Sequence, residues 1–486
     1  MGEFEIISKD VMGRLARIKT PHGEIETPAL LPVINPNLDF IPPKELKKFG
    51  AQGIITNAYI IYRNPELRER ARELGLHKLL DFDGVIMTDS GSYQLSVYGD
   101  VEISNNEIIE FQHEIGSDII TPLDIPTSPD APKELAEKDL NITLCRLEEA
   151  KEIHRKWDDG SLLIAPIQGS TYPDLRKRSA SLSAELDFDI YAIGAMVPLM
   201  DSYRYSTIIS LIAEVKSVLP SSVPVHLFGA GHPMMLPVAV ALGIDLFDSA
   251  AYALYAKDGR YLTPRGTLKI GEMAHFPCSC PVCTSYTPDE VRDSENRDEL
   301  IAKHNLYVTF QELRAVKQAI RNNTLFEMVE ERIRCHPSLL NGWRTMKKYS
   351  HLLEEYDPSY KRSFFYTGIE SCFRPAVERH RRKMNDVELE KDEITVSFTD
   401  SEGDLFFKPP FGPYLPGLSE SYPVGHAEVP ELMEWEAEKI ALEFLLDFVS
   451  SRKNIKFIFK VDESWKGKFE SIRLPKNVKL KIEEDQ

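Results

Sequence analysis

Gly243-Ile-Asp-Leu-Phe-Asp-Ser249 is a short apolar run that ends in a carboxylate and a hydroxyl, and seven comparable runs precede it. A polar or glycine-containing turn and a longer amphipathic segment separate each run from the next. The eight runs are Ala29–Val33, Gly53–Asn57, Gly84–Thr88, Asp118–Leu123, Leu162–Ile167, Ile190–Gly194, Val225–Phe228 and Ile244–Phe247. Such strand and helix units predict an α/β fold, a parallel (β/α)8 TIM barrel. An open, doubly wound sheet is the alternative, but no glycine-rich dinucleotide fingerprint follows the first run.

Polar side chains follow several of these runs. Asp89 follows the third run, Asp124 the fourth, Gln168 the fifth and Asp248 the eighth. A TIM barrel carries its functional groups at the carboxyl ends of its strands. We therefore expect three carboxylates and an amide at one barrel mouth. Glycines at four strand ends would let a flat ligand approach the backbone: Gly91, Gly169, Gly194 and Gly229.

Two carboxylates that face each other across a barrel mouth can cleave a glycosidic bond, one as nucleophile and the other as acid and base. Asp89 and Asp248 are the predicted pair. Two alternatives stay open at this point. The carboxylates could bind a divalent cation, or they could simply cap the helices that follow their strands.

The other groups at the mouth match the edge of a purine. Asp124 can accept hydrogen bonds from an exocyclic amine and a ring N–H, and Gln168 can donate one to a carbonyl oxygen. The Gly194–Ala195 backbone can pair with the remaining edge, and Tyr93 can stack on the ring. These are the donors and acceptors that guanine requires.

A cysteine cluster lies beyond the last run. With one histidine it provides four metal ligands, Cys278, Cys280, Cys283 and His304. Three thiolates and an imidazole complete a tetrahedral zinc shell, and a closed shell is typical of a structural zinc ion. We expect one Zn²⁺ to pin an insertion over residues 270–310, although His275 or His336 could replace His304 as the fourth ligand. Buried thiols without metal are the alternative.

The 486 residues, of which 42% are apolar, are enough for several domains. We expect the barrel and its zinc region over residues 1–334, a helical basic and aromatic segment over 335–390, and a small α+β domain over 391–486. The stretch from 298 to 331 reads as helical. The N-terminus is unlike a signal peptide, and no run of about eighteen apolar residues occurs, so we expect a cytoplasmic protein with no membrane contact.

The net charge of −18 argues against a nucleic-acid partner unless basic groups cluster locally. They do so between Tyr360 and Met384, where aromatic residues are interleaved. We expect RNA contacts from Lys361, Arg362, Arg379, Arg381 and Arg382. A solvated helix face is the alternative.

Taken together, four motifs resemble the tRNA-guanine transglycosylase family, and specifically its archaeal branch. They are Thr88-Asp-Ser-Gly-Ser-Tyr-Gln94, Gln168-Gly-Ser170, Phe247-Asp-Ser249 and the cysteine–histidine cluster. The resemblance covers roughly residues 1–330. It implies a TIM barrel with structural zinc, a homodimer, and replacement of guanine at position 15 of the tRNA D-arm by 7-cyano-7-deazaguanine, on the way to archaeosine.

Carried onto this chain, the resemblance implies that one aspartate attacks the ribose C1′ and the other handles the proton. We favour Asp248 as nucleophile and Asp89 as acid and base, and the reverse assignment stays open. The base-binding residues would be Ser90, Tyr93, Asp124, Gln168, Gly194 and Ala195.

Two departures from the family pattern matter. This chain has Gly194-Ala-Met-Val-Pro198 where bacterial relatives carry a Gly-Gly-Leu-Ala-Val-Gly type segment. The difference favours the nitrile-bearing base, 7-cyano-7-deazaguanine, over the aminomethyl-bearing base of the bacterial enzymes. We recognise no PUA domain, and we expect a separate PUA protein to supply that module. Two further alternatives are an archaeosine-forming paralogue and a non-catalytic RNA-binding subunit of a transglycosylase complex. The presence of both aspartates disfavours them. A metal-dependent hydrolase is a third.

Overall fold

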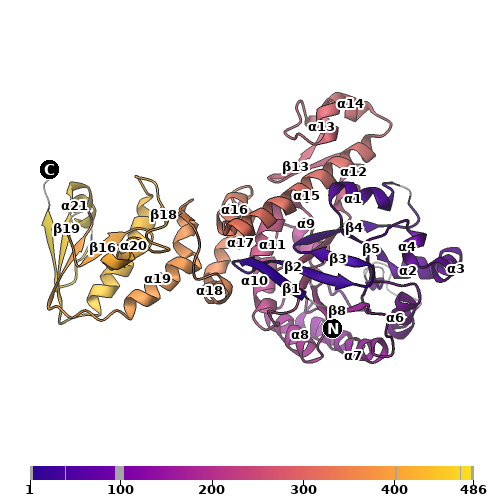
Figure 1. Ribbon diagram of the computed structural model, residues 1–486, viewed down its shortest axis with the longest axis horizontal. Helices are drawn as coiled ribbons and strands as arrows, with labels where there is room; N and C mark the ends of the chain where they lie inside the picture. Colours follow the sequence, from indigo (N-terminus) through magenta and orange to yellow (C-terminus); the bar gives the residue numbers. More distant parts are fainter. Residues whose placement is uncertain (1–3, 39, 93–102, 400–401, 471, 483–486) are drawn as a thin grey trace. The chain divides into compact units, whose positions relative to one another are not determined.

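The computed structural model describes residues 4–38, 40–92, 103–399, 402–470 and 472–482 (Figure 1). The chain forms two compact units. The first unit comprises Met1–Arg321 and Arg332–Met346, and the second comprises Asn322–Glu331 and Lys347–Gln486. No helix in the described part of the chain has the length and apolar character needed to span a membrane.

A closed parallel barrel forms the centre of the first unit, and it confirms the predicted TIM barrel (Figure 1). Its strands pair around the ring in the order β10-β11-β4-β5-β6-β7-β8-β9. The strands are β4 (Ala29–Ile34), β5 (Gly53–Asn57), β6 (Val85–Asp89), β7 (Ile119–Ile120), β8 (Leu162–Ile167), β9 (Ile190–Ile193), β10 (Val225–Leu227) and β11 (Leu246–Ser249). Each coincides with one of the eight apolar runs, because strands buried on both faces need continuous apolar sequence.

Helices follow the strands and cover the barrel. They include α2 (Ala58–Arg63), α3 (Pro65–Leu74), α6 (Asn105–Glu114), α7 (Lys133–His154), α8 (Pro173–Glu185), α10 (Tyr205–Lys216) and α11 (Leu236–Ala241). Local sequence fixes where some of them begin. Asn57 caps α2 through its side-chain oxygen, and Ser104 forms a capping box with Glu107 at the start of α6.

A three-stranded antiparallel sheet precedes the barrel and was not predicted. Its strands are β1 (Phe4–Asp10), β2 (Gly13–Thr20) and β3 (Gly23–Glu26). Arg14 of β2 donates from Nε to Oδ1 of Asp245 over 3.0 Å, and both side chains are buried. Since Asp245 immediately precedes β11, this sheet contacts the barrel at the amino ends of the strands, away from the mouth.

The segment after the barrel carries the cysteine cluster. It contains the hairpin β12 (Arg260–Thr263) and β13 (Gly266–Lys269), then α13 (Pro281–Ser285), α14 (Pro288–Asp293) and the long helix α15 (Arg297–Asn322). The helical stretch expected over 298–331 is divided between α15 and α16 (Leu325–Ile333). Asn323 adopts φ of 60° between them, and a left-handed residue ends a helix.

The second unit has the α+β composition expected for the C-terminal part of the chain. Its sheet pairs in the order β17-β16-β15-β19-β20, and the strands are β15 (Glu393–Ser397), β16 (Leu405–Lys408), β17 (Gly412–Tyr414), β19 (Lys456–Val461) and β20 (Val478–Ile482). Helices α18 (Ser350–Tyr356), α19 (Pro375–Asn385), α20 (Trp435–Ser450) and α21 (Glu463–Phe469) complete it. Leu445, Phe448, Phe457 and Phe459 are fully or almost fully buried in its core.

Candidate active site

The closed parallel barrel places the predicted polar residues at one mouth. Asp89 ends β6, Asp124 and Gln168 follow β7 and β8, and Asp248 is the penultimate residue of β11. The carboxyl ends of parallel strands all face the same side of a barrel. The negative charges of Asp124 and Asp248 both act on the carboxyl group of Asp89.

Asp89 is held by the neighbouring strand. Asn57 and Asp89 are register partners in β5 and β6, and the side-chain nitrogen of Asn57 donates to Oδ2 of Asp89 over 2.9 Å. Burial at the mouth, followed by the charges of Asp124 and Asp248, raises the pKa of Asp89 to about 7. Asp89 can therefore both hold and release a proton near neutral pH.

Asp248 has a different environment. Its Oδ1 accepts hydrogen bonds from the backbone N–H of Gly229 over 2.9 Å and from Nε2 of His226 over 2.8 Å. His226 lies on the adjacent strand β10 and is fully buried. N–H donors aimed at a carboxylate stabilise its negative charge. The two aspartates thus differ in the groups that surround their carboxyl oxygens.

Asp124 and Gln168 belong to a polar cluster at the mouth, together with Ser90 and Ser92. The side-chain nitrogen of Gln168 donates to Oδ2 of Asp124, and Gln168 is fully buried. The hydroxyl of Ser92 accepts from the backbone N–H of Asp124 over 2.9 Å and lies 3.1 Å from the hydroxyl of Ser90. Burial raises the pKa of Asp124. The polar cluster contains both acceptors and donors, as the edge of a flat ligand would need.

Glycines at the strand ends are required by protein neighbours. A Cβ at Gly194 would overlap the side-chain nitrogen of Gln168, and one at Gly229 would overlap Val197. A Cβ at Gly91 would overlap the side chain of Tyr59, and one at Gly169 would overlap the backbone of helix α8. Contacts with protein neighbours thus explain why these positions are glycine, and close approach of a ligand to their backbone stays a prediction.

Arg176 holds the backbone on either side of Gln168 and at Gly194. It lies on α8, is fully buried, and donates to three main-chain carbonyls, those of Ile167, Ser170 and Gly194. Burial lowers the pKa of Arg176 to about 9. Ala195, next to Gly194, has φ of 59°, in the left-handed region. Because C=O and N–H point in opposite directions across a trans peptide, the bond to Gly194 O turns the N–H of Ala195 away from Arg176.

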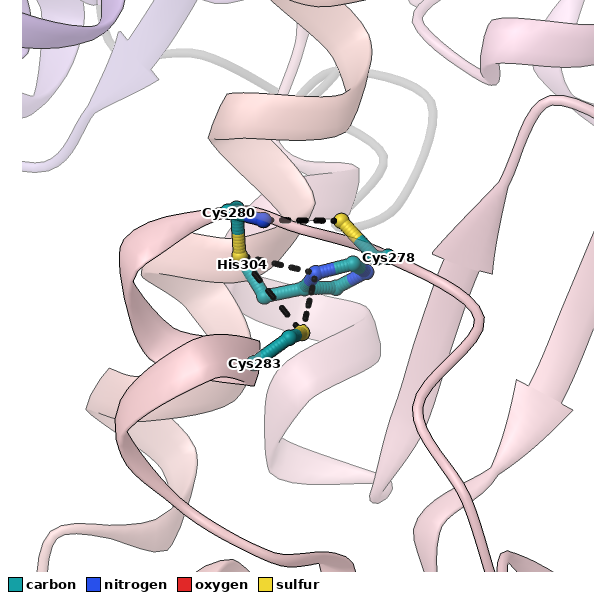
Figure 2. A group of neighbouring side chains, drawn as sticks. All are labelled: Cys278, Cys280, Cys283 and His304. Atoms are coloured by element: carbon teal, nitrogen blue, oxygen red, sulfur yellow. Dashed lines mark hydrogen bonds between the residues drawn. The ribbon is translucent and has the colours of Figure 1, made fainter.

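The cysteine cluster is brought together as expected (Figure 2). Nδ1 of His304 lies 3.5 Å from Sγ of Cys280 and 3.3 Å from Sγ of Cys283, and the two sulfurs are 3.5 Å apart. Cys278 completes a group whose ligand atoms all lie within 4.8 Å of one another. Ligands at zinc distances of about 2.0–2.3 Å in a tetrahedron would be roughly 3.3–3.8 Å apart. The four residues could therefore hold one metal ion.

Groups around the cluster orient its ligands. Nε2 of His304 lies 2.9 Å from the carbonyl oxygen of Leu262, which leaves Nδ1 free for a metal. The ring of Tyr261 stacks on the ring of His304, with their centroids 3.5 Å apart. The hydroxyl of Tyr261 lies 3.1 Å from Sγ of Cys283. The alternative ligands His275 and His336 are outside this group.

The basic residues of the second unit are mostly engaged within it. Lys361 is buried and pairs with Asp357 at 2.7 Å. Arg379 donates to the carbonyl of Glu354 in α18 and to those of Asp357 and Pro358 just after it. Arg381 donates to Pro410 O over 2.7 Å. Arg382 is exposed and pairs with Glu354, while Arg362 is exposed. Two of the five basic side chains expected to contact RNA therefore present their charge at the surface of this unit.

Three residues of the mouth were missed from the sequence: Asn57, His226 and Arg176. Asn57 ends one apolar run and His226 lies inside another. A polar amide or imidazole in an apolar run could have marked both as candidate functional residues. Arg176 lies in an amphipathic helix among other charged residues, and nothing in the sequence marked it as buried. The predicted stacking residue Tyr93 is outside the described residues.

A closed parallel barrel with carboxylates at its mouth has the architecture typical of an enzyme. The sequence matches the family described as queuine tRNA-ribosyltransferase over residues 10–338. The chain belongs to this family, and the resemblance read from its motifs is confirmed.

Its similarity to curated relatives extends over almost the whole chain. A tRNA-guanine(15) transglycosylase of Archaeoglobus fulgidus is 54% identical over 486 residues, which cover 99% of this chain and 100% of that protein. The protein of the same name from Methanosarcina acetivorans is 51% identical, with 94% and 93% covered. That of Methanocaldococcus jannaschii is 49% identical over 92% of this chain and 71% of its own length.

Proposed function

We propose that this protein replaces guanine at position 15 in the D-arm of tRNA by 7-cyano-7-deazaguanine, as a tRNA-guanine transglycosylase of the archaeosine pathway. The names of the relatives, tRNA-guanine(15) transglycosylases, support the tRNA substrate and the position. The observation that carries the chemistry is the contrast between Asp89, whose pKa is raised to about 7, and Asp248, which is held by two N–H donors at the same mouth. We place the reaction in the cytoplasm, where tRNA is found.

The proposed reaction has two displacements. A carboxylate oxygen of Asp248 attacks C1′ of the ribose, the bond from C1′ to guanine N9 breaks, and Asp89 supplies a proton to the departing base. The product is an ester between Asp248 and the tRNA. Asp89, now ionised, removes the ring N–H proton of the incoming base, whose nitrogen attacks C1′ and expels Asp248. Two inversions give net retention at C1′.

The polar cluster would hold each base in turn. Asp124 would accept from the amine and ring N–H that guanine and 7-cyano-7-deazaguanine share, and Gln168 and the backbone N–H of Ala195 would donate to their carbonyl oxygen. Ser90 supports this cluster through Ser92, to which it is hydrogen-bonded. Tyr93 would stack on the ring. The glycosidic bond that breaks and the one that forms are of the same type, so exchange needs no separate energy source.

Labelled-base incorporation tests this function. Purified protein is incubated with archaeal tRNA carrying G15 and with the same tRNA carrying A15, in the presence and absence of a separately supplied PUA-domain protein. The proposal predicts incorporation of labelled guanine and 7-cyano-7-deazaguanine into the G15 substrate only, and little incorporation of the 7-aminomethyl analogue. Incorporation into neither tRNA under either condition would contradict it.

We also propose that the four-ligand cluster binds one structural Zn²⁺. Its sulfur-rich ligand set suits zinc, and no position is left open for a catalytic water. When bound, the ion would link α13 to α15 through Cys283 and His304. Chelation is then expected to release zinc together with loss of fold in this region. Activity lost on chelation and regained at once on adding metal, with the fold unchanged throughout, would contradict a structural role.

Two proposals concern assembly. The exposed residues Arg362 and Arg382 would contribute to tRNA binding by the second unit, and the protein would act as a homodimer, as the family resemblance implies. Light scattering at micromolar concentration that showed only the 55.3 kDa monomer would contradict the dimer.

A further inference from the structure

We propose that His226 is a positioning residue that leaves Oδ2 of Asp248 as the attacking oxygen and stabilises Asp248 as the leaving group of the second displacement. This inference rests on the proposed function, because it assigns a role to a neighbour of the proposed nucleophile. It concerns a residue that no substrate atom would touch.

The two oxygens of Asp248 are not equivalent. Oδ1 accepts from Nε2 of His226 at 2.8 Å and from the N–H of Gly229 at 2.9 Å. No described residue donates to Oδ2. The side chain of Asp248 is 11% exposed, so it is open to the mouth only slightly. The oxygen without donors retains its lone pairs for attack, whereas both donors engage the other oxygen.

The imidazole of His226 can serve only as a donor at Nε2. Its Nδ1 is buried and has no hydrogen-bond partner among the described residues. The ring packs against that of Phe228, with their centroids 4.7 Å apart. A proton on Nδ1 would be a buried N–H without an acceptor, which is costly. The geometry therefore places the hydrogen-bonding proton on Nε2, where Oδ1 of Asp248 accepts it.

The two N–H donors favour the free carboxylate over the ester. When Oδ2 bonds to C1′, the negative charge leaves Asp248 with the electron pair that forms the bond, and Oδ1 becomes a neutral ester carbonyl. A neutral carbonyl accepts hydrogen bonds less strongly than a carboxylate does. When the incoming nitrogen attacks C1′, the pair returns to Asp248 and both hydrogen bonds strengthen. His226 thus promotes departure of Asp248 more than its attack.

The test compares three substitutions at this position. His226→Phe keeps the approximate ring size and removes the donor. His226→Gln places an amide nitrogen near the position of Nε2, and His226→Asn places one near that of Nδ1, so Gln and Asn form a matched pair. For each variant, the covalent protein–tRNA adduct at steady state and the rate of base exchange are measured at equal, folded concentration.

Loss of the Nε2 donor is expected to slow exchange about tenfold while the fraction of protein trapped as adduct rises. His226→Phe and His226→Asn should show this pattern, and His226→Gln should restore both quantities toward those of the wild type. If His226→Phe does not fold, the Gln and Asn variants still make the comparison. A purely structural role would lower exchange and adduct together.

Adduct that falls in step with exchange in the Phe and Asn variants would overturn the proposal, as would variants that all behave like the wild type. Asp248→Asn separates this failure from failure of the proposed function. If adduct still forms in Asp248→Asn, another residue is the nucleophile and the proposed function itself needs revision, whatever the His226 variants do.

Discussion

The side chain of Asn57 joins the start of helix α2 to Asp89. Its oxygen accepts the backbone N–H of Ile60 over 3.0 Å, while its nitrogen donates to Oδ2 of Asp89 over 2.9 Å. A helix cap and the proposed acid–base group therefore share one amide, at adjacent strand ends of the barrel mouth.

Replacing Asn57 by Ser should change the proton affinity of Asp89 and preserve the helix cap, since Ser is also a good N-cap. Loss of a donor to the ionised form raises the pKa of Asp89 further above about 7. Guanine release needs Asp89 protonated, so its rate should fall at a pH about 0.5–1 unit higher than in the wild type. Single-turnover release of labelled guanine measures this.

Asn64→Ser is the control, because Asn64 caps α3 with the same kind of hydrogen bond and has no contact with Asp89 among its described hydrogen bonds. Its pH profile should match that of the wild type. An unshifted profile for Asn57→Ser would contradict the role given to Asn57.

Asp89→Asn should abolish exchange yet stabilise the fold at alkaline pH. A raised pKa means that the folded protein binds this proton more tightly than the unfolded chain does, so ionisation costs stability as the pH rises through about 7. The free energy of unfolding of Asp89→Asn should exceed that of the wild type by about 1–3 kcal/mol more at pH 8 than at pH 5. Urea unfolding at the two pH values measures it.

The control here is Asp83→Asn, since the pKa of exposed Asp83 is lowered, chiefly by its hydrogen bond to Lys47. Asp83→Asn should not increase the free energy of unfolding at pH 8. An Asp89→Asn gain that is independent of pH would show that the ionisation of Asp89 costs the fold nothing.

Arg14 should matter for stability far more than Arg17 on the same strand. Arg14→Ala leaves the fully buried Asp245 without its charge partner, which should cost about 3–5 kcal/mol. Arg17 forms exposed pairs with Glu5 and Glu24, at 3.9 and 3.2 Å, and Arg17→Ala should change stability by less than about 1 kcal/mol. Denaturant unfolding compares the two, and equal effects would contradict the anchoring role of Arg14.

Arg176→Lys should weaken binding of the incoming base while leaving turnover nearly unchanged. Lysine keeps the charge, but it cannot donate in a fixed fork to three carbonyls, so the Gly194–Ala195 peptide loses its fixed orientation. We expect KM for the base to rise about tenfold and kcat to fall less than about threefold. Arg178→Lys, on the exposed side of the same helix and paired with Glu137, is the control and should change neither constant. A fall in kcat at constant KM would contradict this role.

Much of the fold was predictable because buried strands have a recognisable apolar sequence pattern. Strands covered on both faces require continuous apolar runs, and all eight were located in this way. The sheet formed by β1 to β3 was missed because its strands are largely polar, and its attachment depends on the distant pair of Arg14 and Asp245. The interruption at Asn323 depends on one left-handed residue within an otherwise helical pattern.

At the mouth, the sequence indicated which residues end strands but not which of them touch. The metal ligands follow from spacing alone, because three of the four lie within six residues. By contrast, the partners of Asp89 and Asp248 come from neighbouring strands, so pairing Asn57 with Asp89 needs the register of β5 and β6. Lys361 and Arg379 were predicted to contact RNA from composition, but composition does not reveal that acidic and carbonyl groups of the same unit already bind them.

Trapping of the covalent intermediate tests the assignment of the two aspartates most directly. Wild type, Asp248→Asn and Asp89→Asn are each incubated with tRNA, denatured, and examined for a protein–RNA adduct. We predict an adduct with the wild type, none with Asp248→Asn, and a slowly formed but persistent adduct with Asp89→Asn, which lacks the base that resolves it. An adduct that survives in Asp248→Asn and disappears in Asp89→Asn would contradict the assignment and make Asp89 the nucleophile.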